Sequence, residues 1–94
     1  MYIILKSKKL HKKYDVINEY GKRISFGDNR YSDFTKHKDP IRKELYINRH
    51  YKEDWTNLNK AGTWSKYILW NKPTLKASIK NMENTFNIDI LLIA

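Results

Sequence analysis

A dense cluster of basic side chains occupies residues 36–50, which read KHKDPIRKELYINRH. Seven of these fifteen positions hold lysine, arginine or histidine, whereas two hold an acid. Arginine presents a planar fork that matches a phosphate group, and an interleaved tyrosine offers a stacking surface for a base or a sugar. The cluster therefore raises three alternatives: a face that binds a polyanion, a catalytic group, or the solvated side of an ordinary helix.

The sequence predicts a helix that positions much of this cluster. Asp39 is suited to cap the free amides of a helix and Pro40 suits its first position, so we expect a helix from Pro40 to about Tyr51. Successive residues of a helix are rotated by about 100° around its axis. On this basis one side of the helix is mainly apolar and is expected to face the protein interior; it carries Ile41, Glu44, Leu45, Ile47, Asn48 and Tyr51. The opposite side gathers Arg42, Lys43, Tyr46, Arg49 and His50.

This opposite side is the predicted interface. Ordinary solvated helix faces mix both signs of charge and gain pairs four residues apart, but no acid interrupts this one. The loop before the helix adds cations where a helix N-terminus also favours an anion. The full predicted nucleic-acid-binding set is Lys22, Arg23, Arg30, Lys36, His37, Lys38, Arg42, Lys43, Tyr46, Arg49 and His50. Contacts with phosphates would give weak sequence preference, and about five of them would make log K fall with log salt at a slope near −4 to −5.

Composition supports a polyanionic partner. The 94-residue chain carries a formal net charge of +9, which points to nucleic acid, an anionic membrane or an acidic protein. The absence of cysteine excludes disulfides and thiolate zinc sites and is compatible with an intracellular, reducing compartment. The longest apolar runs, YIIL and IDILLIA, fall well short of the roughly 20 residues that a membrane span needs, so we expect no span.

Catalysis has weaker support. His37 and Asp39, with His50 nearby, could form an acid–base unit. However, no serine or cysteine lies in an elbow-like context, no glycine-rich phosphate loop is present, and the three histidines lack metal-ligand spacing. We therefore predict a non-enzymatic protein with no catalytic residue, metal or cofactor, and a small nuclease or phosphotransfer factor is the weaker alternative.

The surrounding elements predict an α+β fold in a single basic domain, residues 1–94. We expect a strand at 2–6, a hairpin of strands near 14–17 and 23–26 turning at Gly21, and an ordered loop at 28–39. A second loop, pinned by Trp55 and Trp64, leads to a short helix in TWSKYILWN (63–71) that stops before Pro73. Apolar residues at Leu75, Ile79, Met82 and Phe86 predict a helix over 74–86. Two to three helices would thus cover a small, mainly antiparallel sheet.

Two apolar segments carry further expectations. The terminal strand IDILLI has little charge and would promote aggregation if it lay on an exposed edge of the sheet. We therefore expect it to pair inside the sheet or with another chain, and a homo-oligomer is an alternative. In WSKYILW, the residues Trp64, Tyr67 and Ile68 share a helical face typical of core packing. Trp70 points elsewhere, where a stacking platform or a subunit contact is the minority interpretation.

Three blocks, GKRISFGDNRYSDFTKHKD, RKELYINRHYKEDW and AGTWSKYILWNKPTLKASI, together resemble a family of small, basic, uncharacterised proteins of nucleocytoplasmic large DNA viruses and giant viruses. The similarity covers residues 12–90. It implies a viral factory, in cytoplasm or nucleus, or a virion, and it assigns no catalytic residue. We therefore expect a viral protein that binds DNA or RNA by contacting the phosphate backbone of the nucleic acid. The alternative is a structural virion protein (minor capsid, cement or core component) whose basic face meets acidic capsid or core proteins.

Overall fold

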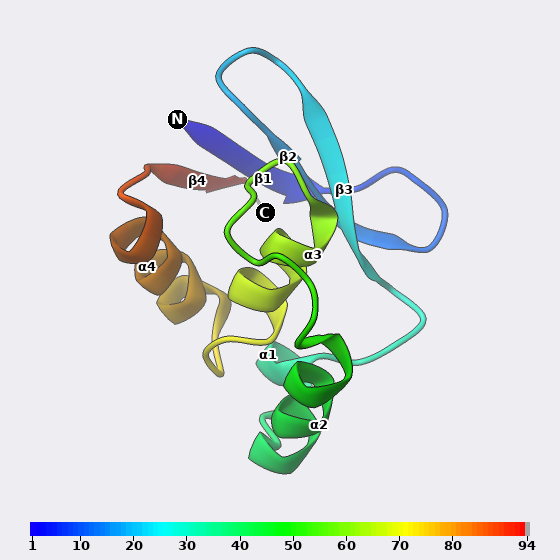
Figure 1. Cartoon of the computed structure of the whole chain (residues 1–94). Helices are drawn as coiled ribbons and strands as arrows, with labels where there is room; N and C mark the ends of the chain where they lie inside the picture. Colours follow the sequence, from blue (N-terminus) through cyan, green and yellow to red (C-terminus); the bar gives the residue numbers. More distant parts are fainter. Residues whose placement is uncertain (94) are drawn as a thin grey trace.

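The computed structural model describes residues 1–93 and contains one four-stranded sheet with helices on one side (Figure 1). The strands are β1 (Tyr2–Lys6), β2 (Lys12–Ile17), β3 (Arg23–Asp28) and β4 (Ile90–Ile93), in the order β3-β2-β1-β4. β1 and β2 pair antiparallel, as do β2 and β3, whereas β4 runs parallel to β1. The predicted α+β fold with a mainly antiparallel sheet is confirmed.

The predicted hairpin is formed by β2 and β3. Gly21 adopts a φ of 81°, a conformation that residues with a Cβ rarely adopt, and the Asn18 side chain accepts hydrogen bonds from the amides of Tyr20 and Lys22. These local contacts set the register in which Val16 faces Ile24 and Tyr14 faces Phe26. Alternate residues of the hairpin thereby point towards the helices.

The helices are α1 (Phe34–His37), α2 (Pro40–His50), α3 (Ala61–Trp64), the π-helical η1 (Ser65–Leu69) and α4 (Leu75–Phe86). The short α1 lies within the stretch expected to be a loop. The short helix before Pro73 begins earlier than expected, at Ala61, and continues through η1. Within residues 1–93, none of these helices is both long and apolar enough to cross a bilayer.

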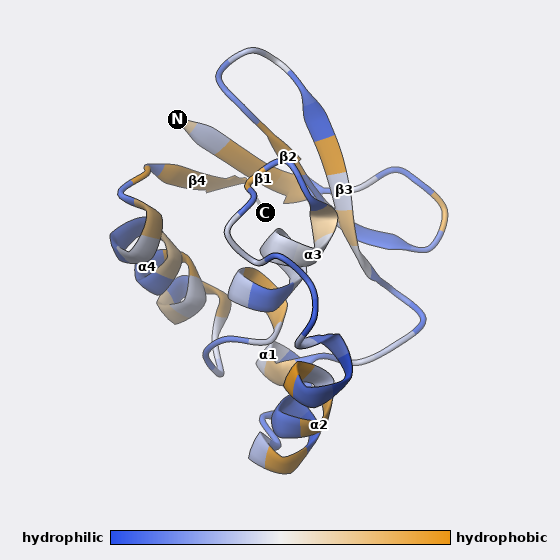
Figure 2. Ribbon diagram, in the orientation of Figure 1, coloured by the Kyte–Doolittle hydropathy of each residue, from blue (hydrophilic) through white to orange (hydrophobic). Residues whose placement is uncertain are grey.

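The core lies between the sheet and the α3–η1–α4 segment. Ile4, Val16 and Phe26 contribute the sheet side, and they pack against the following helical residues: Trp64, Ile68, Leu69, Ile79 and Met82. The predicted stripe of α4 is confirmed, because Ile79 and Met82 are buried while Leu75 and Phe86 pack at the margin. Most of the apolar colour in Figure 2 accordingly follows the strands, whereas α2 is mainly hydrophilic with short apolar stretches.

The last strand has one open side. β4 pairs with β1 and forms an edge of the sheet, so the expectation that it pairs inside the sheet is wrong. Leu91 and Ile93 lie on the face without helices and are about half exposed. Pairing with another chain stays a prediction.

Candidate nucleic-acid interface

Helix α2 begins as the sequence predicts. The Asp39 carboxylate accepts hydrogen bonds from the amides of Ile41 (2.9 Å) and Arg42 (3.4 Å), and Pro40 occupies the first helical turn. The cap satisfies amides that would otherwise lack an intrahelical partner. The start of the basic helix is therefore fixed by local chemistry.

The face that α2 turns to the protein differs from the prediction. Ile41 and Leu45 are 68% and 55% exposed, and no residue of α2 is fully buried. The expectation that the apolar side lies in the interior is wrong. Instead Tyr46, expected on the solvent side, packs inward and stacks on Trp70 with ring centroids 4.3 Å apart and an interplanar angle of 3°.

Trp70 holds α2 in this orientation because it and Tyr46 are the two inner rings in a series of four aromatic rings that contact one another. His37 lies against Trp70 with centroids 5.4 Å apart, and His50 lies 4.4 Å from Tyr46 in the same series. Lys43 adds a polar anchor, since its Nζ donates to the backbone carbonyl of Asn71 at 2.6 Å. Burial, followed by the charge of Lys72, lowers the pKa of Lys43. Lys43 is thus engaged in the fold rather than presented to a phosphate.

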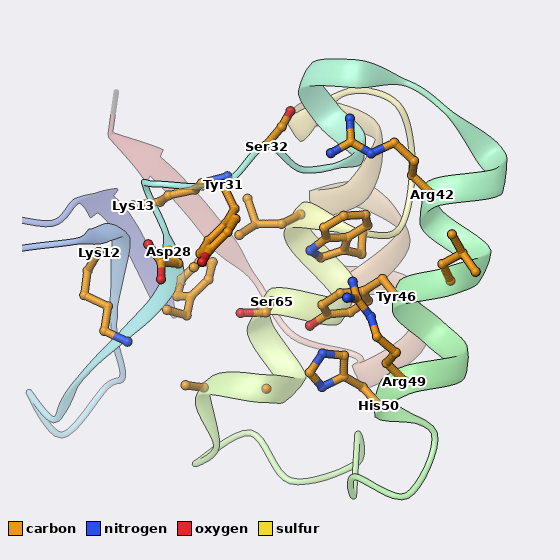
Figure 3. A pocket seen from close by; sticks show the side chains of 17 residues that line it. Lys12, Lys13, Asp28, Tyr31, Ser32, Arg42, Tyr46, Arg49, His50 and Ser65 are labelled. Atoms are coloured by element: carbon orange, nitrogen blue, oxygen red, sulfur yellow. The ribbon is translucent and has the colours of Figure 1, made fainter.

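A hollow of about 670 Å³ lies between α2, the end of β3 with residues 31–32, and the α3–η1 segment. Arg42 and Arg49 lie two turns apart on α2 and project towards the hollow, with Tyr46 on the turn between them (Figure 3). Both arginines are exposed, and neither forms an ion pair within residues 1–93. The two guanidinium groups therefore share one solvent-accessible site, as predicted, although the far side of their helix is exposed.

The opposite wall of this hollow carries two lysines, one of which has no ion pair within residues 1–93. Lys12 is exposed and unpaired among the described residues, whereas Lys13 forms a nearly buried ion pair with Asp33. Asp28 lines the same wall, and hydrogen bonds from Arg30 hold the pKa of its carboxyl well below the usual range. Because Arg30 neutralises Asp28 and Asp33 neutralises Lys13, the hollow keeps the positive charge of Lys12 and the two arginines.

A second hollow, of about 550 Å³, adjoins the first and shares Lys12, Lys13, Tyr31 and Ser32 with it. Lys6, Arg30 and Lys36 also line this second hollow. We use the name basic groove for the two hollows together with the cations around them that form no ion pair within residues 1–93: Lys6, Lys12, Lys36, Arg42 and Arg49. The structure thus brings Lys36 into one surface with the α2 arginines, whereas Arg30 lines the second hollow but is paired with Asp28.

Other predicted residues do not join this surface as free cations. His37 Nδ1 accepts from the Asp39 amide at 3.0 Å, its Nε2 is buried without a partner among residues 1–93, and burial lowers its pKa. Lys38 donates to the carbonyls of Thr35 and Pro73. His50 contacts the Glu53 carboxylate, so its ring is both stacked and paired.

Lys22 and Arg23 lie at the far end of the hairpin from α2 (Figure 1). Arg23 is also paired with the buried carboxylate of Asp15 at 3.0 Å. Their proposed membership of one interface with α2 is therefore not supported by position. The prediction placed Lys22 and Arg23 beside α2 although they lie next to the hairpin turn. Only the other end of β3 lies near α2, because the two ends of a strand are at opposite ends of the domain.

Sequence reasoning missed several lining residues. Tyr31 lines both hollows, and Ser65 projects its hydroxyl into the first one (Figure 3). Tyr31 follows Arg30, and an aromatic residue next to a cation in a polar loop could have indicated that Tyr31 belongs to the predicted interface. Ser65 lies in a helix whose pattern indicates core packing, and nothing local marks it.

Residues 2–50 match a family of unknown function (DUF5754). The chain belongs to this family. The matched range runs from β1 through α2, so family membership covers Lys12, Tyr31, Arg42 and Arg49, whereas Ser65 and Trp70 lie beyond it. No curated protein and no solved structure matches the chain.

Proposed function

We propose that this protein is a non-enzymatic nucleic-acid-binding protein whose basic groove holds the phosphate backbone. The observation that carries the proposal is the pair of exposed guanidinium groups of Arg42 and Arg49, unpaired within residues 1–93, which face one hollow with Lys12 on its opposite wall. Arginine suits this role because its fork donates two parallel hydrogen bonds to a phosphate. Lys6 and Lys36 continue the positive surface into the adjoining hollow.

The chemistry of the groove favours backbone contacts over base-edge reading. Its free cations come from separate segments and do not form a single projecting helix face that could follow a major groove. About five phosphate contacts would give a salt slope near −4 to −5, with weak sequence preference. Low sequence preference and strong salt dependence are therefore the signature of this proposal.

A charge-reversal experiment tests it. Arg42→Glu combined with Arg49→Glu should nearly abolish binding of a labelled oligonucleotide, measured by fluorescence anisotropy at several salt concentrations. Lys76→Glu combined with Lys80→Glu is the matched control, because these two exposed lysines lie on α4, outside the groove, and their reversal changes the net charge equally. Equal losses in the two variants would mean that net charge alone attracts the nucleic acid, and unaltered affinity of the arginine variant would defeat the proposal.

A protein partner is the second candidate. Ile41 and Leu45 are largely exposed on α2, Leu45 at the rim of the hollow and Ile41 outside it, and apolar residues beside cations suit an acidic protein surface. In the viral setting that the sequence resemblance predicts, this partner would be a capsid or core protein of the virion. Ile41→Ser, at a position that does not line the groove, should then remove the protein from purified particles while leaving oligonucleotide binding intact; retention in the particles would refute this candidate.

A further inference from the structure

The hollow beneath α2 contains more than a phosphate site requires. Leu69, Trp70 and Leu45 contribute apolar surface to its lining, which also includes the small residues Ala61 and Gly62. Its volume of about 670 Å³ falls within the range of about 300–1,000 Å³ that is usual for small-molecule sites. A phosphate alone would gain nothing from an apolar lining, since burying its charge against carbon is unfavourable.

The aromatic side chains of this hollow differ in how much ring surface they leave free. Tyr46 is covered by Trp70 and by His50, and Trp70 is covered by Tyr46 and by His37. Tyr31, in contrast, is 70% exposed and stands on the wall opposite α2 (Figure 3). Tyr31 is therefore the residue that offers a ring face to an incoming planar group.

Polar groups converge on the same space. The hydroxyls of Tyr46 and Ser65 point into the hollow (Figure 3), and neither has a hydrogen-bond partner among residues 1–93. Burial raises the pKa of Tyr46 to about 12, so its hydroxyl, neutral near pH 7 like that of an ordinary tyrosine, also stays neutral at higher pH and can donate as well as accept. Such hydroxyls can pair with the edge of a base whichever base it is.

We infer that this hollow receives one unpaired nucleobase, stacked on Tyr31, while Arg42, Arg49 and Lys12 hold the phosphates beside it. The inference rests on the proposed function and adds the ligand class: single-stranded nucleic acid, or a nucleotide with the same base and phosphate. In a duplex the bases are paired and stacked, so none can enter the hollow unless it is flipped out of the helix. The groove therefore prefers a single strand over a duplex of the same sequence.

An abasic strand separates base recognition from phosphate recognition. A labelled single strand, a strand of equal length without bases, and the corresponding duplex carry the same backbone phosphates along the labelled strand. Base stacking predicts that the intact strand binds about tenfold more tightly than the abasic strand, and more tightly than the duplex. Equal affinity for intact and abasic strands, or tighter binding of the duplex, would overturn the inference while the proposed function stands. If no oligonucleotide binds, both fail.

Two variants assign the effect to this hollow. Tyr31→Ala should weaken binding of the intact strand about tenfold and leave the abasic strand unchanged. Tyr20→Ala is its matched control, since Tyr20 is 87% exposed at the hairpin turn, away from the groove. Ser65→Leu, which fills the hollow and keeps every cation, should reproduce the Tyr31→Ala result. Unaltered binding of the intact strand by the Tyr31 variant would contradict the inference whether or not the Ser65 variant folds.

A competition experiment distinguishes a strand from a free nucleotide. A nucleoside monophosphate should displace the intact strand at concentrations at which inorganic phosphate does not, because the base adds its own contacts. A monophosphate that competes as strongly as the strand itself would identify a free nucleotide as the ligand with the same base site. Equal displacement by phosphate and by the monophosphate would overturn the base site.

Discussion

Helices α2 and α4 have similar lengths, and each carries an apolar stripe, yet they are held by different interactions. α4 turns Ile79 and Met82 into the core beneath the sheet. α2 leaves Ile41 and Leu45 in solvent and is attached through the stack of Tyr46 on Trp70 and the hydrogen bond from Lys43. An apolar stripe thus predicts the buried side of a helix only when an apolar surface elsewhere in the fold is free to receive it.

The difference also relates to function. A helix sunk in the core can contribute only one exposed face, whereas α2 stands at the margin of the domain, away from the sheet (Figure 1). Its inward side carries aromatic and cationic residues together, and these line a hollow. The less buried helix is therefore the one that supplies the binding surface.

The largest expected effect is a difference in unfolding free energy between truncating an apolar side chain of α4 and truncating one of α2. Met82→Ala should lower the free energy of unfolding by about 2–5 kcal/mol, because this side chain is fully buried and its loss leaves a cavity. Leu45→Ala, at an exposed position, should change it by less than about 0.5 kcal/mol. Urea unfolding followed by circular dichroism measures both. Comparable losses would show that the apolar side of α2 is buried after all.

A smaller effect is expected from the two helix caps. Thr74 accepts from the Ala77 amide and Asp39 from the amides of α2, so replacing either by alanine should cost about 1 kcal/mol of helix stability. Thr74→Ala should lower the midpoint of global unfolding, since α4 belongs to the core. Asp39→Ala should mainly speed hydrogen exchange within 40–50. Slower exchange there, or a global loss equal to that of Thr74→Ala, would contradict the distinction.

The stack of Tyr46 on Trp70 is expected to stabilise the attachment of α2 without changing the stability of the sheet. Tyr46→Leu keeps an apolar side chain but removes the stack on Trp70, which should weaken the attachment of α2 by about 0.5–1.5 kcal/mol. Hydrogen exchange within 40–50 should rise, while the amides of β1 and β2 keep their protection. A double-mutant cycle with Trp70→Leu isolates the pair; a coupling energy near zero would show that Lys43 alone holds the helix.

The smallest effect is a pH dependence from His37. Burial is the main cause of its lowered pKa, the charge of Arg42 acts in the same direction, and Asp39 and Asp33 oppose both. Because the folded protein binds this proton less readily than the unfolded chain, the stabilising contribution is present above the ordinary pKa of 6.5 and is lost as pH falls below it. Unfolding in urea at pH 7.5 and pH 5.5 should show a smaller acid loss for His37→Gln than for the parent.

Much of the fold could be predicted because its signals are local. The strand at Tyr2–Lys6, the turn at Gly21, the start of α2 at Asp39 and the stripe of α4 depend on turn, cap and periodicity rules. The position of β4 could not be predicted, because strand order depends on which surfaces remain after the helices have packed. The same applies to Tyr31 and Ser65, which meet in one hollow although they are distant in sequence.

The candidate site shows the same division. Its arginines were predicted to project together, since residues 42 and 49 lie two turns apart on a helix and therefore share a side. His37, Lys43 and His50 were predicted beside them but are engaged by Trp70, Asn71 and Glu53, all later in the chain. Partners contributed by distant segments leave no trace in the local pattern.

The sequence by itself determined the strong positive charge, most of the elements and the spacing of Arg42 and Arg49, because these follow from composition and from short-range backbone rules. Only the tertiary structure decided which side of α2 faces the protein. That choice depends on Trp70, whose ring is brought to Tyr46 by the packing of η1 on the sheet, and an aromatic stack of this kind outweighed the burial of Ile41 and Leu45.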